Sequence, residues 1–246
     1  FEVGRRAELT DFGRQCLPIA REMVDQFAEQ SMRLGSISSM PSVTIAVLPS
    51  FASRWLPEFL SVFSARHSDI ALRVLDGNSR TIEELVIGAR ADIGIVSLGA
   101  ADRRFVTKPL LTDEFGLICH RSDPLARAAT LPWSKVDRRA VLGNLTHQLL
   151  AGGPAAPYVQ APRMFVSNMT SLLSLIANGG WVSPLPVLAV PAHARDVVAV
   201  PLRRPRVVRQ IALIRLKAKP LTPAVAKIEA IVDEILAAER ARTGGT

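Results

Sequence analysis

Hydrophobic and small positions near the start of the chain follow a heptad spacing. They recur every three or four residues at Leu17, Ala20, Val24, Phe27, Ser31 and Leu34. This spacing predicts one long helix whose apolar stripe packs lengthwise against a partner helix; the alternative is a helix docked on its own domain. Thr10 followed by Asp11 provides an N-cap, whereas Pro18 favours a kink. The segment 35–41, rich in Gly, Ser and Pro, predicts a linker after the helix.

After Pro41 the pattern changes to alternating strands and helices. Short β-branched or alternating runs predict strands, and apolar residues three or four apart predict helices. In chain order the predicted elements are a strand 43–47, a helix 51–63, a strand 70–75, a helix 80–87, and strands 93–96, 106–110 and 115–119. Strands and helices at this spacing predict an α/β fold with a mainly parallel sheet.

A stretch rich in Pro and Gly, residues 151–162, interrupts this pattern, and a second α/β series follows it. Its predicted elements are a strand 164–166, a helix 170–178, strands 182–183 and 211–216, and a closing amphipathic helix 224–238. The chain therefore divides into two α/β halves that follow the N-terminal helix.

Composition and charge narrow the function classes. Of the 246 residues 48% are hydrophobic and 21% charged, as in an ordinary soluble protein. No apolar run reaches the ~18 residues of a membrane helix, and the N-terminus lacks the order of a signal peptide. Cys16 and Cys119 lie far apart, which excludes a cysteine cluster for zinc and favours a reducing compartment, so we expect a cytoplasmic protein. The net charge of +8, concentrated after residue 200, favours an anionic partner such as nucleic acid; a solvated basic face is the alternative.

Catalytic motifs are missing from the sequence. It contains no G-x-S-x-G, P-loop, G-x-G-x-x-G or H-E-x-x-H motif, and its four histidines form no i, i+4 pair for a metal. The acid pair Asp113-Glu114 starts a predicted strand, where solvated charge is the usual interpretation. We therefore expect no enzyme, metal or cofactor; an enzyme whose site is assembled from distant residues is the alternative.

Four segments, in the same order along the chain, resemble the LysR-type transcriptional regulators. The first thirteen residues, FEVGRRAELTDFG, are similar to that family's wing strands and the L-T-x-x-G start of its linker helix. The segment IAVLPS at 45–50, with LP at 56–57, resembles the first strand and helix of the effector domain. GARADIGI at 88–95 resembles a G-x-x-D-x-x-I strand, and IANGGWVSPLP at 176–186 resembles V-x-A-G-x-G-I-x-x-L-P.

The resemblance implies an α/β fold with two Rossmann-like subdomains of periplasmic-binding-protein type, preceded by a remnant wing and a long linker helix. Residues 1–9 would be the remnant of a winged helix-turn-helix DNA-binding domain, most of which would precede Phe1. Residues 10–40 would form the linker helix and hinge, and 41–246 the effector-binding domain. Within it, subdomain I would comprise about 41–119 and 200–246, and subdomain II about 120–199.

The resemblance also implies three partners: double-stranded DNA, a small-molecule effector and further copies of the chain, as a homodimer or homotetramer. Arg5 and Arg6 in the wing would contact DNA, where phosphate contacts position a protein without choosing a sequence. The linker helix would dimerise through Leu17, Ala20, Val24, Phe27 and Leu34. The runner-up is a solute-binding protein of periplasmic type, which shares the two-lobed architecture but gives the wing and the heptad helix no role.

Two polar residues at the starts of predicted helices mark a candidate effector site. Ser50 begins the helix 51–63 and Asn168 precedes the helix 170–178. Ligands in such folds bind beyond the carboxyl ends of strands, where helix N-termini offer free N–H groups, so we expect a small organic acid there. The resemblance implies that the effector contacts Ser50, Phe51, Ser97, Leu98, Asn168 and Met169. The alternative is that Ser50 and Asn168 are only N-caps. Trp181 stands where the family usually has Gly, and either narrows the cleft or packs in the second half.

We predict that the chain forms at least a dimer. Without a partner, the apolar stripe would expose Val24, Phe27 and Leu34 to water, at ~1.5–3 kcal/mol for each large side chain. The resemblance implies a second contact between effector domains through the helix 51–63. Sedimentation velocity at micromolar concentration should show a dimer or a larger species; a monomer would contradict the prediction.

Overall fold

The computed structural model describes residues 10–36, 40–136, 141–159, 162 and 164–242, without the side chains of 28–36 and of Gln148. The chain forms two compact units, of which the smaller holds the N-terminal helix and the larger a mixed sheet with its helices. Among the described residues, no helix is both long and apolar enough to cross a membrane.

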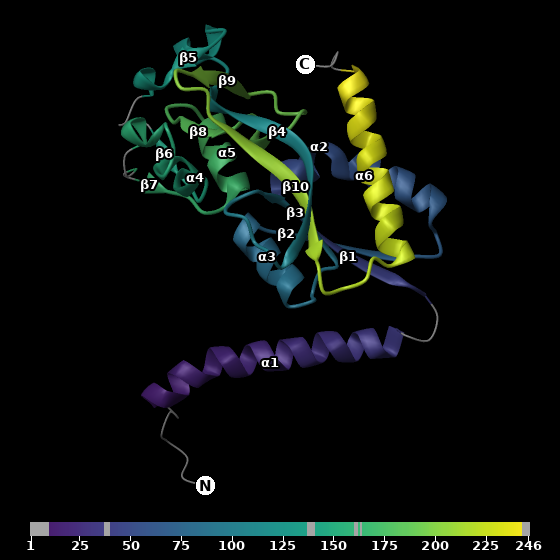
Figure 1. The fold of residues 1–246 in the computed structure, drawn as a ribbon. Coiled ribbons are helices and arrows are strands. Elements are labelled where there is room, and N and C mark those ends of the chain that lie inside the picture. The colour runs from purple at the N-terminus through teal and green to yellow at the C-terminus, as the bar shows by residue number, and fades with distance from the viewer. Residues whose placement is uncertain (1–9, 37–39, 137–140, 160–161, 163, 243–246) are drawn as a thin grey trace. The chain divides into compact units, whose positions relative to one another are not determined.

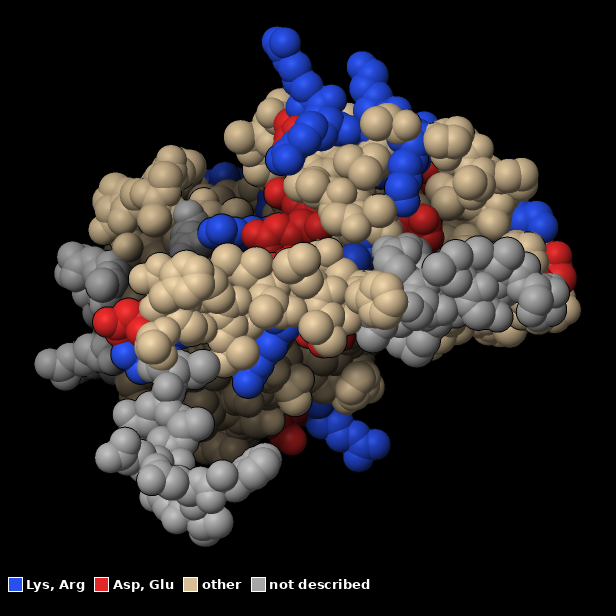
Figure 2. Space-filling view, turned by 90° about the horizontal axis from the view of Figure 1, so that it is seen from below, with Lys and Arg blue, Asp and Glu red and all other residues tan. Residues whose placement is uncertain are grey.

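The predicted N-terminal helix is confirmed as α1 (Asp11–Ser36). Thr10 caps it, since its Oγ1 accepts the Gly13 N–H at 3.1 Å, and Pro18 lies inside the helix. Among the predicted dimerisation residues, Leu17 is half-buried, whereas Ala20, Val24 and Phe27 are exposed; the side chain of Leu34 lies outside the described residues. In Figure 2, the part of α1 that is drawn in colour and faces the viewer consists mostly of residues other than Lys, Arg, Asp and Glu. The exposed large hydrophobic residues of α1 include Phe12, Ile19, Met23, Val24 and Phe27.

One sheet of eight strands forms the framework of the larger unit (Figure 1). Its path runs β2–β1–β3–β10–β4–β9–β5, and β8 pairs with β4 beside this path. The strands are β1 (Ser42–Val47), β2 (Ala71–Asp76), β3 (Ile93–Ser97), β4 (Phe105–His120), β5 (Leu131–Pro132), β8 (Ser183–Pro186), β9 (Val197–Arg203) and β10 (Val208–Leu216). A separate small sheet joins β6 (Leu142–Gly143) to β7 (Met164–Phe165).

The strand directions correct the prediction of a mainly parallel sheet. β1 and β3 are parallel, as are β5 and β9 and also β6 and β7. In the centre, however, β10 runs antiparallel to both β3 and β4, and β4 runs antiparallel to β8 and β9. Because β10 pairs with strands far away in the sequence, the local alternation of strands and helices does not reveal its direction.

The two predicted strands 106–110 and 115–119 are one strand of 16 residues, β4. From Phe105 to Glu114 it pairs with β10, and from Phe115 onward it pairs with β8 and β9. The strand therefore changes partners between Glu114 and Phe115, where the two halves of the sheet join. β9 and the short helix α4 (His147–Ala151) were not predicted. The exact subdomain boundaries stay a prediction.

Three helices flank the first half of the sheet: α2 (Pro49–Arg66), α3 (Ser79–Ile87) and α6 (Pro223–Arg242). They confirm the predicted helices 51–63, 80–87 and 224–238, and α5 (Met169–Ala177) in the second half confirms 170–178. α2 and α6 lie side by side (Figure 1) and are joined by the ion pairs Arg54–Glu239 and Arg66–Glu234, both at 2.6 Å. α3 packs directly on β3.

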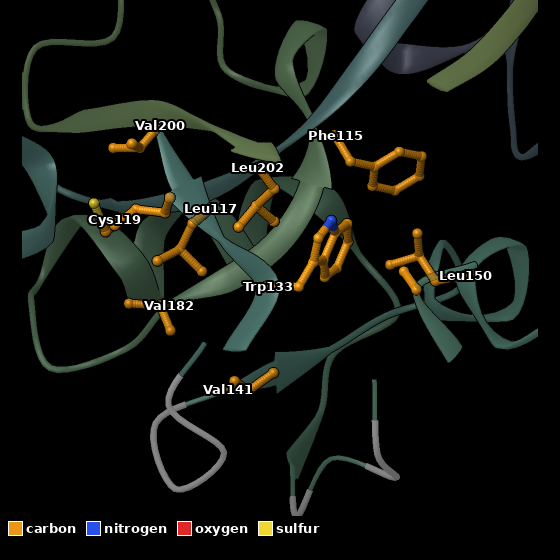
Figure 3. Close-up of a cluster of buried hydrophobic side chains, with 11 residues drawn as sticks. Phe115, Leu117, Cys119, Trp133, Val141, Leu150, Val182, Val200 and Leu202 are labelled. Atoms are coloured by element: carbon orange, nitrogen blue, oxygen red, sulfur yellow. The ribbon is translucent and has the colours of Figure 1, made fainter. Parts of the chain in front are cut away.

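A separate hydrophobic cluster fills the second half (Figure 3). Phe115, Leu117 and Cys119 alternate along β4 and share one face, as side chains two residues apart must. Trp133 and β9 residues complete this cluster. Both cysteines are free, Cys16 half-buried and Cys119 fully buried. Burial raises the pKa of the Cys119 thiol to about 11, so this side chain is a neutral part of the core at physiological pH.

We predict that Gly94→Ala destabilises the protein. A Cβ at Gly94 on β3 would lie 2.7 Å from Cγ2 of Ile82 and 2.9 Å from Cγ1 of Ile214, both in the core. Overpacking of this kind costs about 1–3 kcal/mol of unfolding free energy. Gly99→Ala is the matched control, because nothing lies within 4 Å of its Cβ position, and we expect a change below about 0.5 kcal/mol. Urea unfolding of both variants checks the prediction, which fails if Gly94→Ala matches the wild type.

Candidate functional site

A buried ion pair that the sequence analysis did not identify lies at the centre of the candidate site. Arg209 on β10 and Asp113 on β4 face each other in register, and their side chains are only 8% and 2% exposed. Nε and Nη2 of Arg209 lie 2.9 and 2.8 Å from Oδ2 of Asp113. The interpretation of Asp113 as solvated charge is wrong, because the alternation of β4 turns this side chain inward. Its neighbour Glu114 is half-buried and pairs instead with Arg203, at 2.9 Å.

Burial dominates the electrostatics of the pair. It raises the pKa of the Asp113 carboxyl and lowers the pKa of the Arg209 guanidinium, since each loses hydration, and each partner's charge opposes the shift. Such a pair contributes little net stability compared with apolar residues, but removal of one partner leaves an uncompensated buried charge. The pair therefore fixes the arrangement of the groups around it.

Ser50 is held by this pair. Nη2 of Arg209 donates a hydrogen bond of 2.9 Å to Ser50 Oγ. The N-cap of α2 is Leu48, which makes no side-chain cap, so the N-cap alternative is wrong for Ser50. The first hydrogen bond of the helix runs from Ala52 N–H to Leu48 O. The backbone N–H groups of Ser50 and Phe51 precede this bond and are free of intrahelical partners.

The same carboxylate also connects the two halves of the sheet. Oδ1 of Asp113 accepts the backbone N–H of Leu188 at 3.2 Å, and Leu188 lies in a 3₁₀ helix (Val187–Ala189) that follows β8 in the second half. One side chain thus links Arg209 and Ser50 on one side to the second half on the other.

Ser97, at the end of β3, is buried, and its side chain lies on the same face of the sheet as Arg209. Its Oγ has no hydrogen-bond partner within the described part of the chain, and the residue is 4% exposed. Gly94 faces α3, so Ser97, three residues later, faces away from that helix. Its register partner Ile211 lies two residues after Arg209, which puts Ser97 and Arg209 on one face. Leu98 beside it is half-buried, and its N–H donates to Gln210 O at 2.8 Å.

The remaining predicted effector residues differ in their exposure and in the groups that a ligand could contact. Phe51 is buried with its ring centroid 4.8 Å from that of Trp55, so only its backbone N–H is available. Asn168 is exposed and caps α5, since its Oδ1 accepts the Ser171 N–H at 3.0 Å. Met169 is half-buried against the second-half core. Among the described residues, no hydrogen bond joins Asn168 to Ser50.

Two further buried polar residues follow β6. This strand pairs in parallel with β7, which precedes Asn168 in the chain. Asn144 and His147 are 3% and 8% exposed, and the Asn144 N–H donates to His147 Nδ1 at 3.2 Å. Asn144 Nδ2 and His147 Nε2 have no partner in the structure as described. Burial lowers the pKa of His147, so its ring is neutral at physiological pH. The second half thus adds uncharged hydrogen-bonding groups.

Trp181 packs, half-buried, against the core of the second half, in line with the packing alternative. The left-handed turn before it is made by Gly179 and Gly180, with φ of +81° and +80°, where other residues are strained. The predicted DNA contacts Arg5 and Arg6 lie outside the described residues.

A cavity of about 400 Å³ lies elsewhere, between α2 and α6. Its lining residues are Arg54, Trp55, Glu58, Ala192, Glu239 and Arg242. The charged groups neutralise one another, because Arg242 pairs with Glu239 and Glu58 at 2.8 and 3.3 Å, and Arg54 pairs with Glu239. Such a lining offers no unpaired charge to an anionic ligand.

Comparisons with known proteins define the class. The family described as LysR substrate binding domain matches residues 38–237, and the chain belongs to this family. YbhD of Escherichia coli K12, named as an uncharacterized HTH-type transcriptional regulator, is 28% identical over 239 residues, which are 93% of this chain and 74% of YbhD. The chain is thus a LysR-type transcriptional regulator with an effector-binding domain, and the family supports this interpretation over a solute-binding protein.

Solved structures of the same fold include two with bound acids. The effector-binding domain of QuiR in complex with shikimate matches with a TM-score of 0.69 at 18% identity, over 81% of this chain and 99% of that domain. The effector-binding domain of BenM with benzoate matches with a TM-score of 0.67 at 16% identity, over 82% and 95%. Both confirm the predicted α/β fold of periplasmic-binding-protein type.

We predict a non-additive loss of stability when the buried pair is broken. Asp113→Leu or Arg209→Met alone should lower the free energy of unfolding by about 3–5 kcal/mol, because the remaining charge stays buried without a partner. The double variant should recover most of this loss. Arg80→Gln and Glu84→Gln form the control, since this pair on α3 is 89% and 62% exposed and contributes about 0.5 kcal/mol or less. Urea denaturation of each set gives the coupling energies; additive losses at Asp113 and Arg209 would contradict the prediction.

Proposed function

We propose that the effector is a small organic acid, bound between the two halves of the effector domain at Ser50, Phe51, Ser97, Leu98, Asn168 and Met169. The buried Ser97 hydroxyl without a partner carries the proposal, because a buried polar group in a native protein is normally hydrogen-bonded. The start of α2 adjoins the end of β3, since Leu48 N–H donates to Ile95 O at 3.2 Å, and its free N–H groups favour an anion. Shikimate and benzoate, which QuiR and BenM bind, are both carboxylic acids.

The regulator would act on DNA as a cytoplasmic homodimer or homotetramer. The exposed apolar residues of α1, with Val24 at 65% and Phe27 at 75%, support dimerisation through this helix, because apolar area of that size is unfavourable in water. Arg5 and Arg6 would contribute phosphate or minor-groove contacts next to the helix-turn-helix. Effector binding would change how the two halves meet, and the pair of subunits would pass this change to DNA.

We predict that Ser50→Ala and Asn168→Ser each weaken binding of benzoate or shikimate by about tenfold, as expected for a lost hydrogen bond to a charged group. Asn168→Ser keeps an N-cap residue on α5, so stability is preserved. Ser53→Ala on the exposed face of α2 is the control and should bind like the wild type. Thermal shift and calorimetry measure both effects. If the acids bind and both variants bind as tightly as the parent, the site lies elsewhere.

A further inference from the structure

We propose that Arg209 is the residue that selects an acid: its guanidinium holds the carboxylate of the effector while it stays paired with Asp113. The inference rests on the proposed function, and adds a residue on a strand that joins the two halves. Its basis is the combination of a buried cation, a hydroxyl that this cation orients and a helix start at one place in the fold.

The contact between Arg209 and Ser50 decides what the serine can offer. A hydroxyl has one proton and two lone pairs, and Nη2 of Arg209 already donates to Ser50 Oγ. Two donors cannot share a hydrogen bond, so the Ser50 proton points away from Arg209. Ser50 stands at the start of α2, so its O–H and the free N–H groups of Ser50 and Phe51 are donors at the same end of the helix. This end of α2 offers donors, which fits a carboxylate and disfavours an ammonium group.

Arg209 has capacity left for a second anion. Asp113 occupies the edge formed by Nε and Nη2, and among the described residues Nη1 has no partner. A guanidinium carries five N–H donors, and the two N–H groups of Nη1 remain for a ligand carboxylate while Nε and Nη2 contact Asp113 and Ser50. With 8% of its surface exposed, the side chain is reachable at its rim. A ligand carboxylate at Nη1 would lie within reach of the α2 start, since Nη2 already contacts Ser50.

Asp113 determines how strongly Arg209 attracts the carboxylate of a ligand. It is the carboxylate directly paired with Arg209, whereas Glu114 points to the opposite face of β4 and pairs with Arg203 and Arg206. The negative charge of Asp113 therefore reduces the positive charge that a ligand meets at Arg209. Removal of the Asp113 charge should tighten the binding of an acid, whereas removal of both charges should weaken it. A purely structural pair would not give opposite signs.

The experiment compares acids with neutral counterparts on the full chain of residues 1–246. The probes are benzoate and shikimate, with benzamide and methyl shikimate as neutral counterparts, measured by calorimetry. The variants are Asp113→Asn, which keeps Arg209, and Asp113→Asn with Arg209→Gln, which keeps shape and hydrogen bonding without a charge. Arg80→Gln removes an exposed cation as the control. Circular dichroism confirms that each variant is folded at the temperature used.

We expect at least one acid to bind the wild type more tightly than its neutral counterpart. Asp113→Asn should bind that acid about threefold more tightly or better. The double variant should bind it about 10- to 100-fold more weakly and lose the preference over the neutral counterpart. Arg80→Gln should change nothing.

The outcomes separate the two proposals. If neither acid binds the wild type, the proposed site fails and the role of Arg209 fails with it. The same holds if Ser50→Ala and Asn168→Ser bind the acid as tightly as the wild type does. If those two variants weaken binding but the double variant at 113 and 209 binds like the wild type, only the role of Arg209 fails. Equal weakening by Asp113→Asn and by the double variant would also overturn it, because that result marks a structural pair. If neither variant folds, the pair serves folding and the proposal is likewise overturned.

Discussion

The ion pair between Asp113 and Arg209 is the interaction on which the arrangement of the site depends. It lies where β4 and β10 face each other, and its hydrogen bonds reach α2 through Ser50 and the second half through Leu188. A change in register would separate the two buried charges, and a buried charge without its partner is strongly destabilising. The register of the two strands, the start of α2 and the position of Leu188 are consequently fixed together.

Much of the fold could be predicted from the sequence because its elements are locally encoded. The heptad spacing of α1, the periodicity of α2, α3 and α6, the apolar runs of β1 and β3 and the alternation in β2 all arise from neighbouring residues. What could not be predicted is the partner of each strand. The polar run of Thr112, Asp113 and Glu114 interrupts the apolar pattern of β4 and makes it look like two strands, while its continuity comes from pairing with β10 about a hundred residues later.

The candidate site shows the same division between local and long-range information. Ser50, Ser97 and Asn168 could be proposed because each follows a strand or starts a helix. Arg209 was missed because the predicted strand began at Ile211, and Asp113 because charges at strand starts are usually solvated. A signal was present in both strands: Arg209 alternates with Ile211 and Leu213, and Asp113 with Phe115 and Leu117, all buried. A charged residue that continues an apolar alternation is a candidate for a buried pair.

The change of partners inside β4 has a mechanical consequence. At this point Phe115 N–H donates to Val207 O at 3.0 Å, and Glu114 pairs in register with Val208, so two adjacent strands carry the chain between the halves. A two-stranded ribbon bends poorly in its own plane but twists readily. Rotation of the halves about an axis along the ribbon would keep the hydrogen bonds between its two strands. Asp113 lies beside this crossing, and such a rotation would act on its hydrogen bond with Leu188 in the second half.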